Sequence, residues 1–291
     1  MSTDTRIWHH FTVDVEEYFQ VTALEPYFPR ASWEETPSRL ALGTRALLEL
    51  LAEHNSRGTF FTLGWVGKHH PSIVSEIAAS GHEIASHGWG HERITTLSPK
   101  QFRASVRDSK AALEDIAGTA VIGYRAPSFS IVRGSEWALD ILVEEGYRYD
   151  SSLYPVVRPG YGFAGGGRFP YRLQTASGAL EEFPPATVRS GPVVLPAGGG
   201  AYIRLLPHML VRAGFKAAER AGVPATFYIH PWELDPEQPR VRVPLRTRIR
   251  HYGGLRRTVP RLRRLLEEFR FQPITETLER QIPERLAPTS G

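Results

Sequence analysis

Short apolar runs alternate along this chain with longer amphipathic stretches, and this alternation limits the folds that the chain can adopt. The apolar runs indicate buried strands at 10–15, 58–63, 83–86, 121–124 and 225–229. The amphipathic stretches indicate helices at 38–54, 71–80, 98–116, 136–145, 207–221 and 258–269. Because such alternation is typical of parallel strands joined by right-handed crossovers, we predict an α/β fold, a distorted or incomplete (β/α) barrel.

The residues at the ends of two of these helices agree with the expected boundaries. Ser98 is a helix-capping residue type, and Pro99 suits the first position of a helix. Gly81 is suited to end the preceding helix. Residues 154–203 are rich in Gly and Pro and are expected to form loops and short hairpins. No repeat or low-complexity linker divides the chain, so we expect a single domain over residues 1–291.

The composition excludes several classes of protein. Hydrophobic residues make up 41% and charged residues 23% of the 291 positions, as in ordinary globular proteins. No run approaches the roughly 20 apolar residues needed to span a bilayer, and residues 1–10 contain no apolar signal core. We therefore expect a cytoplasmic protein. The chain has no cysteine, which excludes disulfides, thiolate metal ligands and a cysteine nucleophile.

Positive charge gathers in one segment of a chain whose net charge is only +4. Residues 240–264 contain ten arginines and no acidic residue. Such a segment forms either a surface for anionic lipid, a phosphate-linked substrate or a polyanion, or a solvated loop and helix face. Nucleic acid is not an expected partner, because the chain has no recognisable reader motif and Tyr252 is the single aromatic residue in the segment.

Polar side chains follow the apolar runs at the points where the predicted strands end. The residues in these positions are Asp14, His87, Arg125, Asp150 and His230. The carboxyl ends of parallel barrel strands meet on one face, where catalytic groups of such barrels lie. The sequence therefore predicts that these side chains come together.

Two histidines and two acids have the spacing of a metal site. His87 and His91 are four residues apart, so both imidazoles can reach one point and supply nitrogen ligands to a divalent ion. Along an extended strand Asp14 and Glu16 share one face, with Val15 on the other. One carboxylate can then bind the metal while the other accepts a proton from the attacking water.

Three further positions suit the chemistry of an acyl transfer. A guanidinium at Arg125 can orient an acid and keep it ionised. After Pro127 the amide of Ser128 is placed to donate to an oxyanion. His230 is a candidate proton donor, and a hydrogen bond from its ring to Asp150 would raise its pKa.

Residues 196–202, which end at Tyr202, are a candidate substrate loop. They lack the lysine and the strand–glycine–helix setting of a phosphate loop, so no nucleotide site is expected.

Together these motifs resemble those of the NodB-type polysaccharide deacetylases of carbohydrate esterase family 4. The resemblance covers roughly residues 8–235, and five motifs occur in the family's order, at 13–19, 58–64, 81–91, 123–130 and 229–233. The set is similar to a narrower branch that is associated with exopolysaccharide and exosortase gene clusters and carries a C-terminal extension. The resemblance implies a barrel of the NodB-homology type, with residues 236–291 as an extension packed on it.

The resemblance also implies a role for each site residue. Asp14 would be the catalytic base, steadied by Arg125, and His230 would be the general acid, tuned by Asp150. The expected catalytic residues are thus Asp14, His230, Arg125, Asp150 and Ser128. The expected substrate-binding residues are Phe129, Trp232 and Tyr202. The expected metal ligands are Glu16, His87 and His91.

Two positions depart from the family's common pattern. The commonest first motif has two adjacent aspartates, the second of which binds metal; here Val15 holds that place, so Glu16 must supply the oxygen ligand. In the third motif Ser128 follows the proline, and the aromatic residue comes one position later, as Phe129. Some relatives with a modified first motif hydrolyse cyclic amides without a metal.

The sequence therefore predicts a hydrolase that removes N-acetyl groups from amino sugars of a polysaccharide or lipid-linked oligosaccharide in exopolysaccharide biosynthesis. The expected cofactor is a divalent metal, zinc, and the expected location is the cytoplasm, with peripheral contact to the anionic inner membrane surface. Two alternatives stay open: another amide hydrolase of this fold, allantoinase-like or deformylase-like, and a non-catalytic carbohydrate-binding module. An oligomeric state is also left open.

Overall fold

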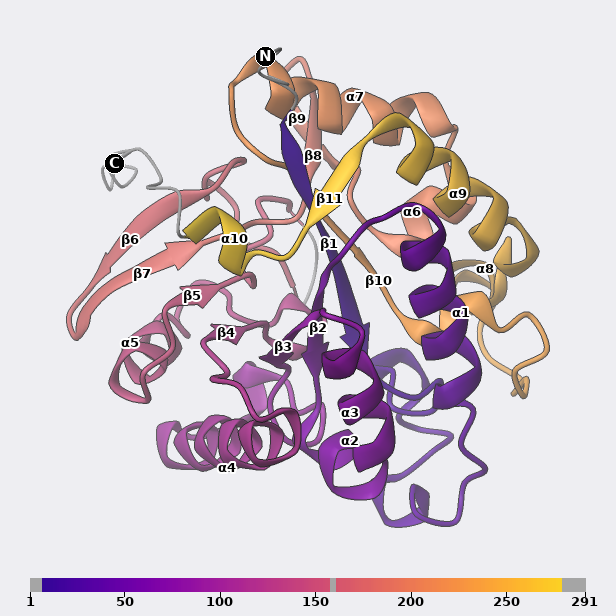
Figure 1. Ribbon diagram of the computed structural model, residues 1–291. Helices are drawn as coiled ribbons and strands as arrows, with labels where there is room; N and C mark the ends of the chain where they lie inside the picture. The colour runs from indigo at the N-terminus through magenta and orange to yellow at the C-terminus, as the bar shows by residue number, and fades with distance from the viewer. Residues whose placement is uncertain (1–6, 158–160, 279–291) are drawn as a thin grey trace.

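A single, mostly parallel sheet forms the centre of the molecule (Figure 1). The computed structural model describes residues 7–157 and 161–278. Within these residues the strand order is β10-β1-β2-β3-β4-β5-β7-β6, and β11 also pairs with β1. All neighbours from β10 to β7 pair in parallel, whereas β6 and β7 form an antiparallel hairpin. The strands are β1 (Trp8–Val15), β2 (Thr59–Thr62), β3 (Glu83–Ser86), β4 (Gly123–Tyr124), β5 (Tyr149–Asp150), β6 (Tyr171–Thr175), β7 (Gly178–Glu182), β10 (Thr226–Ile229) and β11 (Arg270–Gln272).

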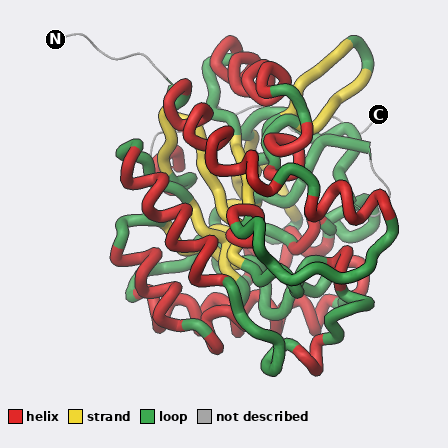
Figure 2. The backbone as a smooth tube through the Cα atoms, turned by 90° about the vertical axis from the view of Figure 1, so that its right-hand side faces the viewer, coloured by secondary structure: helices red, strands yellow, loops and turns green. Residues whose placement is uncertain are grey.

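Helices surround this sheet on its outer side (Figure 2). They are α1 (Leu40–Glu53), α2 (Gly64–His69), α3 (Pro71–Ala79), α4 (Pro99–Ala117), α5 (Trp137–Glu144), α6 (Gly200–Leu205), α7 (His208–Arg220), α8 (Leu245–Tyr252), α9 (Thr258–Glu268) and α10 (Thr275–Leu278). A separate hairpin pairs β8 (Thr187–Ser190) with β9 (Val193–Pro196). Among the described helices none combines the length and the apolar character that crossing a bilayer requires.

The ring of strands is incomplete, which confirms the predicted fold class. Two isolated bridges, Pro185 with Thr226 and Gly199 with Tyr228, connect β10 to the chain that follows β7. A continuous ladder of hydrogen bonds does not close the ring between these two described segments. The structure is therefore an open (β/α) barrel.

Alternation along β1 separates the core from the site. Phe11, Val13 and Val15 are fully buried and belong to the main hydrophobic cluster with α1 residues such as Leu47 and Leu51. The intervening side chains, which include Asp14, lie on the other face of the strand, toward the barrel interior. Burial of the apolar face is worth roughly 1.5–3 kcal/mol for each large side chain, so it fixes the register of this polar row.

The expected helix ends are confirmed at α3 and α4. The Ser98 side chain accepts a hydrogen bond from the Gln101 amide, and the Gln101 side chain accepts one from the Ser98 amide, which forms a capping box before Pro99. Gly81, just after α3, has a φ of +78°, a left-handed conformation that favours glycine.

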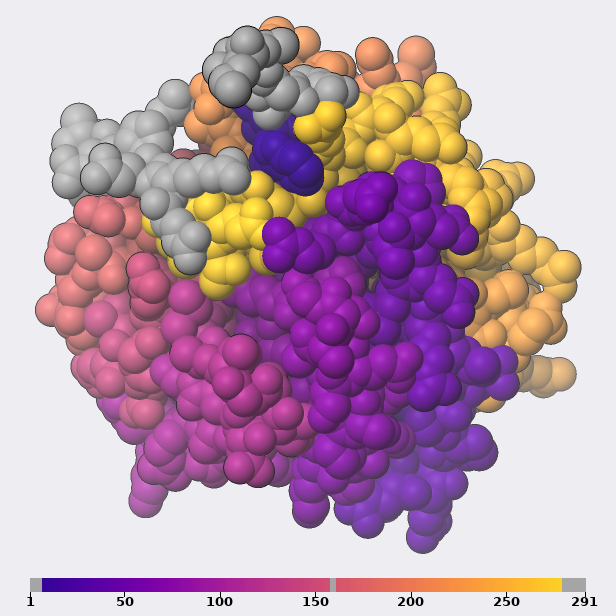
Figure 3. Space-filling view, viewed as in Figure 1, coloured from indigo at the N-terminus to yellow at the C-terminus, as the bar shows by residue number. Residues whose placement is uncertain are grey.

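Several short elements were not predicted. The helices α2, α6 and α8 and the strands β5 and β11 were absent from the sequence interpretation, because two- to six-residue elements and an arginine-rich helix carry little periodic signal. Strand β11 pairs with the start of β1, so the predicted extension contributes a strand to the central sheet. Figure 3 shows this start of the chain, in indigo, against yellow C-terminal residues at the surface. The division into one domain with an extension stays a prediction.

Candidate active site

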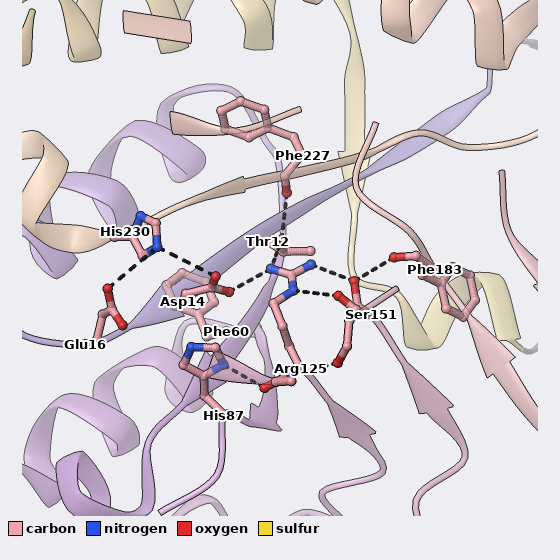
Figure 4. A network of polar contacts seen from close by, with 12 residues as sticks. Thr12, Asp14, Glu16, Phe60, His87, Arg125, Ser151, Phe183, Phe227 and His230 are labelled. Carbon is pink, nitrogen blue, oxygen red and sulfur yellow. Dashed lines mark hydrogen bonds and ion pairs between the residues drawn. The ribbon is translucent and has the colours of Figure 1, made fainter. Parts of the chain in front are cut away.

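Four strand ends bring the predicted site residues to one edge of the barrel (Figure 4). Asp14 lies in β1 and Glu16 just after it; His87 follows β3, Arg125 follows β4, and His230 follows β10. The strands are parallel and adjacent or nearly so in the sheet, which is why residues more than 200 positions apart in sequence meet here.

Glu16, His87 and His91 form a group that could hold a metal ion. Each offers one ligand atom, and these atoms lie within 4.8 Å of one another. All three side chains are buried. Oε2 of Glu16 lies 2.7 Å from Nε2 of His91, yet it has no well-aligned hydrogen-bond donor among the described residues. A buried carboxylate oxygen without a donor is costly unless a cation satisfies it.

The protonation states of two of these residues suit a metal. Nδ1 of His87 lies 2.7 Å from the carbonyl oxygen of Arg125, so this nitrogen donates and Nε2 is left as the ligand atom. Burial lowers the pKa of His87 to about 4, which keeps the ring neutral at pH 7. Burial opposes ionisation of Glu16, but His91 and His230 hold its pKa below its usual range. Two imidazoles and one carboxylate are a donor set that zinc and related ions accept.

Asp14 stands outside this group and is held by Arg125. The guanidinium is fully buried, and its NH1 donates to Oδ1 of Asp14 and to the Thr12 hydroxyl, both at 2.7 Å. NH2 donates to the hydroxyl of Ser151 at 2.7 Å, and the group lies 4.1 Å from the centre of the Phe61 ring. The other carboxylate oxygen of Asp14 lies 3.8 Å from Nε2 of His230. Arg125 thus orients one oxygen of Asp14 and leaves the other facing the site.

His230 is fixed from the opposite side. Its Nε2 faces both acids, 3.8 Å from Asp14 and 3.6 Å from Glu16. Its Nδ1 donates to Oε1 of Glu233 at 2.7 Å, and Oε2 of Glu233 accepts from Nε of Arg204 at 2.7 Å. Burial opposes protonation of His230, but Glu16, Glu233 and Asp14 together raise its pKa to about 9. The His230 ring is therefore held in its protonated form at neutral pH.

Arg204 ties this histidine to the C-terminal part of the chain. The guanidinium is fully buried in α6. Besides Glu233 it donates to the carbonyl oxygens of Arg250 at 2.9 Å and His251 at 3.2 Å, and to that of Gly253. The backbone at the end of α8 thus positions Arg204, which positions Glu233, which positions His230.

Asp150 does not contact His230, so the expected hydrogen bond between them is corrected. Its carboxylate accepts from the hydroxyl of Ser152 at 2.5 Å and from the Ser152 amide at 3.1 Å, and burial raises its pKa. These hydrogen bonds hold the Asp150 carboxylate at the end of β5, and among the described residues none joins it to His230. Glu233, rather than Asp150, is the carboxylate that accepts a hydrogen bond from His230. Its spacing, three residues after His230 within one turn, was the signal that the sequence analysis missed.

Asp150 instead supports the turn after β4. Ser152, which donates to Asp150, accepts a hydrogen bond from the Ala126 amide at 2.8 Å. Farther along this turn Ser128 and Phe129 have φ values of 56° and 52°, in the left-handed region. Such residues cost roughly 1–3 kcal/mol each and persist where the surroundings impose them. The oxyanion role of the Ser128 amide stays a prediction.

The three residues expected to contact substrate occupy different settings. Trp232 is buried between the rings of His230 and His251, with ring centres 5.0 Å and 4.3 Å away, and its Nε1 donates to Oε1 of Glu16 at 3.1 Å. It therefore supports the site residues. Phe129 packs against the Tyr228 ring at 4.9 Å. The Tyr202 hydroxyl lies 3.4 Å from that of Tyr161.

Two glycines of the candidate loop 196–202 leave room for the side chains of Tyr228 and Glu233. A Cβ at Gly199 would lie 2.4 Å from the Tyr228 ring. A Cβ at Gly200 would lie 1.9 Å from a carboxylate oxygen of Glu233. The loop therefore allows the close approach of the residues that surround His230.

Comparison with known families agrees with this geometry. The family described as "Polysaccharide deacetylase" matches residues 33–149, and the one described as "Domain of unknown function (DUF3473)" matches residues 151–279. Residues 33–149 are therefore similar to polysaccharide deacetylases, and residues 151–279 to a family without an assigned function. His87, His91 and Arg125 lie in the first match and His230 in the second, whereas Asp14 and Glu16 precede both.

Curated relatives match the chain over part of their length. A peptidoglycan deacetylase of Helicobacter pylori is 29% identical over 112 residues, which are 38% of this chain and 37% of that protein. A chitooligosaccharide deacetylase of Rhizobium leguminosarum bv. trifolii is 29% identical over 99 residues, which are 34% of this chain and 43% of that protein. The chain thus spans less than half the length of these relatives.

Solved structures share the fold over nearly the whole chain. A protein of Mycobacterium smegmatis assigned as a polysaccharide deacetylase is 23% identical, with a TM-score of 0.63 and coverage of 100% of this chain and 97% of that one. Puue allantoinase is 16% identical, with a TM-score of 0.63 and coverage of 96% and 91%. At these identities the likeness concerns the fold alone.

Proposed function

We propose that this protein is a metal-dependent N-deacetylase of amino sugars, with zinc bound by Glu16, His87 and His91. One observation carries the proposal: a buried oxygen and nitrogen donor group, an Arg-held carboxylate and a protonated histidine all face one point. The domain match and the names of the relatives, which act on peptidoglycan and chitooligosaccharides, support the same reaction class.

The side chains divide the work of amide hydrolysis. A divalent ion in the Glu16 group would supply Lewis-acid polarisation of the acetyl carbonyl and acidify water near it. Asp14, held by Arg125, accepts the proton of the attacking water through its free oxygen. The Ser128 amide donates to the oxyanion as it develops. His230 gives its Nε2 proton to the departing amine, while Glu233 holds the ring at Nδ1.

The proposed substrate is an N-acetylated polysaccharide or lipid-linked oligosaccharide of exopolysaccharide biosynthesis. The proposed setting is the cytoplasm, at the inner membrane face, where such a lipid-linked intermediate is accessible. The arginine-rich segment 240–264 supports contact with a diphosphate lipid or an anionic bilayer.

The test is acetate release from N-acetylglucosamine oligomers by purified protein, before and after chelation and after zinc is restored. We expect activity that chelation removes and zinc restores, with about one metal per chain by elemental analysis and none in His87→Ala. Folded, zinc-treated protein that carries no metal would contradict the metal assignment.

A second candidate is hydrolysis of another amide, of the allantoinase or deformylase kind. The structural likeness to an allantoinase, equal in TM-score to that with the deacetylase-like protein, favours keeping it. Allantoin and an N-formyl amine in the same assay separate the two, because acetate release is unique to the first proposal. A non-catalytic carbohydrate-binding module would bind oligomers and turn over none of the three.

A further inference from the structure

Arg250 presents an exposed positive charge close to the proton donor. It lies near the end of α8, and its backbone carbonyl accepts from Arg204, so its position is tied to the chain of contacts that holds His230. Among the described residues no acid forms an ion pair with its guanidinium. The titratable groups that act on it most strongly are three phenols, those of Tyr161, Tyr228 and Tyr202.

Together with the guanidinium these tyrosines form what we call the Arg250 cluster, made of Arg250, Tyr161, Tyr202 and Tyr228. The guanidinium carbon lies 5.5 Å from the centre of the Tyr161 ring. The hydroxyls of Tyr161 and Tyr202 lie 3.4 Å apart. Beside them the hydroxyl of Tyr154 is buried and has no hydrogen-bond partner among the described residues. The cluster thus combines a cation and several hydroxyls with no anion.

The cluster adjoins the catalytic side chains. The Tyr228 ring packs edge-on against the His230 ring, with 5.9 Å between the centres, and against Phe129 at 4.9 Å. Tyr228 is held there because Gly199 leaves room for its ring. One member of the Arg250 cluster, Tyr228, therefore lies directly against the residue that protonates the leaving amine.

We propose that the Arg250 cluster binds a negatively charged group on the sugar residue next to the acetamido sugar that is hydrolysed. This inference rests on the proposed function, since it names the substrate class of that site: an acidic glycan. Guanidinium binds carboxylate and phosphate oxygens through two parallel hydrogen bonds, and the phenols add neutral donors. Arg246 lies one turn earlier on the same side of α8 and extends the positive charge along the helix.

The exposed side of α8 could instead bind an anionic membrane, but the geometry favours this interpretation less. Leu245 and Ile249 are 59% and 51% exposed, and together with arginines they are typical of a helix that lies on an anionic bilayer. Arg250, however, lies beside tyrosines, one of which, Tyr228, packs against His230. We therefore argue for the glycan and make the membrane an outcome of the test.

The test measures binding, so that it does not depend on turnover. Asp14→Asn protein is titrated calorimetrically with three N-acetylated oligosaccharides of equal length: one neutral, one with a uronate and one with a phosphate. We expect at least one acidic oligosaccharide to bind about tenfold or more tightly than the neutral one at low salt, as for hydrogen bonds between charged groups. Adding Arg250→Gln should abolish the difference. Arg248→Gln, two residues away on another side of α8, is the matched control and should keep it.

Each outcome decides the inference. Equal affinity for all three glycans, or a preference that survives Arg250→Gln, overturns it, and the uronate and phosphate arms identify the anion. Binding to phosphatidylglycerol vesicles that both arginine substitutions weaken, without a glycan preference, also overturns it in favour of the membrane. If the unsubstituted protein releases no acetate while the charge-dependent binding persists, the proposed function fails and the acidic-glycan site stands.

Discussion

The two halves of the chain hold their catalytic side chains in different ways. In the first half the backbone and one arginine suffice: a carbonyl oxygen of β4's end fixes His87, and Arg125 fixes Asp14 directly. In the second half His230 depends on a series of side chains, Glu233 and then Arg204, which ends on the carbonyls of α8. The candidate metal group and the proposed base are therefore built locally, whereas the proposed acid depends on contacts that span the C-terminal segment.

Metal binding and proton abstraction should therefore be separable from proton donation by His230. Changes in the first half should affect metal or base, and changes in the second half should affect the acid without loss of metal.

Asp14→Asn should reduce acetate release by roughly 10²–10⁴, because it removes the proposed proton acceptor. Zinc content should stay near that of the unsubstituted protein, since Asp14 is outside the Glu16 group. Steady-state rates and elemental analysis on the same preparation check both expectations. Near-normal turnover would show that another group is the base.

Glu16→Gln should weaken zinc binding more than Asp14→Asn does. Mutation of a residue that only hydrogen-bonds to a metal ligand lowers metal affinity roughly 10–100-fold. Because Glu16 itself is the proposed oxygen ligand, its substitution should lower zinc affinity by at least this factor. Competition with a chelator of known affinity measures the dissociation constant. Equal zinc affinity in the two variants would break the assignment of Glu16 as ligand and favour the metal-independent amide hydrolase.

Glu233→Gln should lower turnover by about 10–100-fold and leave zinc content unchanged, as for other groups that orient a catalytic side chain. It should also move the alkaline limb of the pH profile. His230 must be protonated to act, so activity falls as pH rises through its pKa of about 9, and loss of the Glu233 charge shifts that fall to lower pH. An unchanged alkaline limb would mean that Glu233 has only a structural role. Glu237→Gln, an exposed acid nearby, is the control.

His10 joins the two halves and should make stability depend on pH. Its ring bonds Thr226 of β10 at 3.1 Å and Thr277 of α10 at 2.8 Å, and burial lowers its pKa to about 3. The neutral ring is favoured in the folded state, so its stabilisation is complete above pH 6.5 and is lost as pH falls toward 3. From pH 6.5 to 5 we expect about 1–2 kcal/mol less unfolding free energy from this residue. Urea unfolding of His10→Gln should show a flatter dependence; an identical slope would exclude the linkage.

The sequence predicted the first half well because its signals are local. Strand β3 matched its expected bounds, and the four-residue spacing of His87 and His91 marked a pair that does lie together. Alternation along β1 placed Asp14 and Glu16 on one face. Each of these inferences needs only a few neighbouring residues.

The surroundings of His230 were predicted only in part, because the residues that position it are far apart in the sequence. His230 was identified at a strand end, but Asp150 was assigned as its partner, and neither Glu233 nor Arg204 was considered. Arg204 is separated from Glu233 by β10 and α7, and its other acceptors are backbone carbonyls that carry no sequence signature. Such pairings depend on the packing of α6 against α8, which periodicity alone does not show.

The pairing of β1 with β11 has a consequence for how the chain folds. Trp8, His9 and His10 find partners in Arg270, Phe271 and Gln272, so the first of the described strands pairs with the last of them. Contacts of such sequence separation slow folding, and until they form β1 offers an unpaired edge to other chains. We expect the barrel to stay incomplete at this edge until β11 has been made, with the unpaired edge of β1 as a point at which chaperones act.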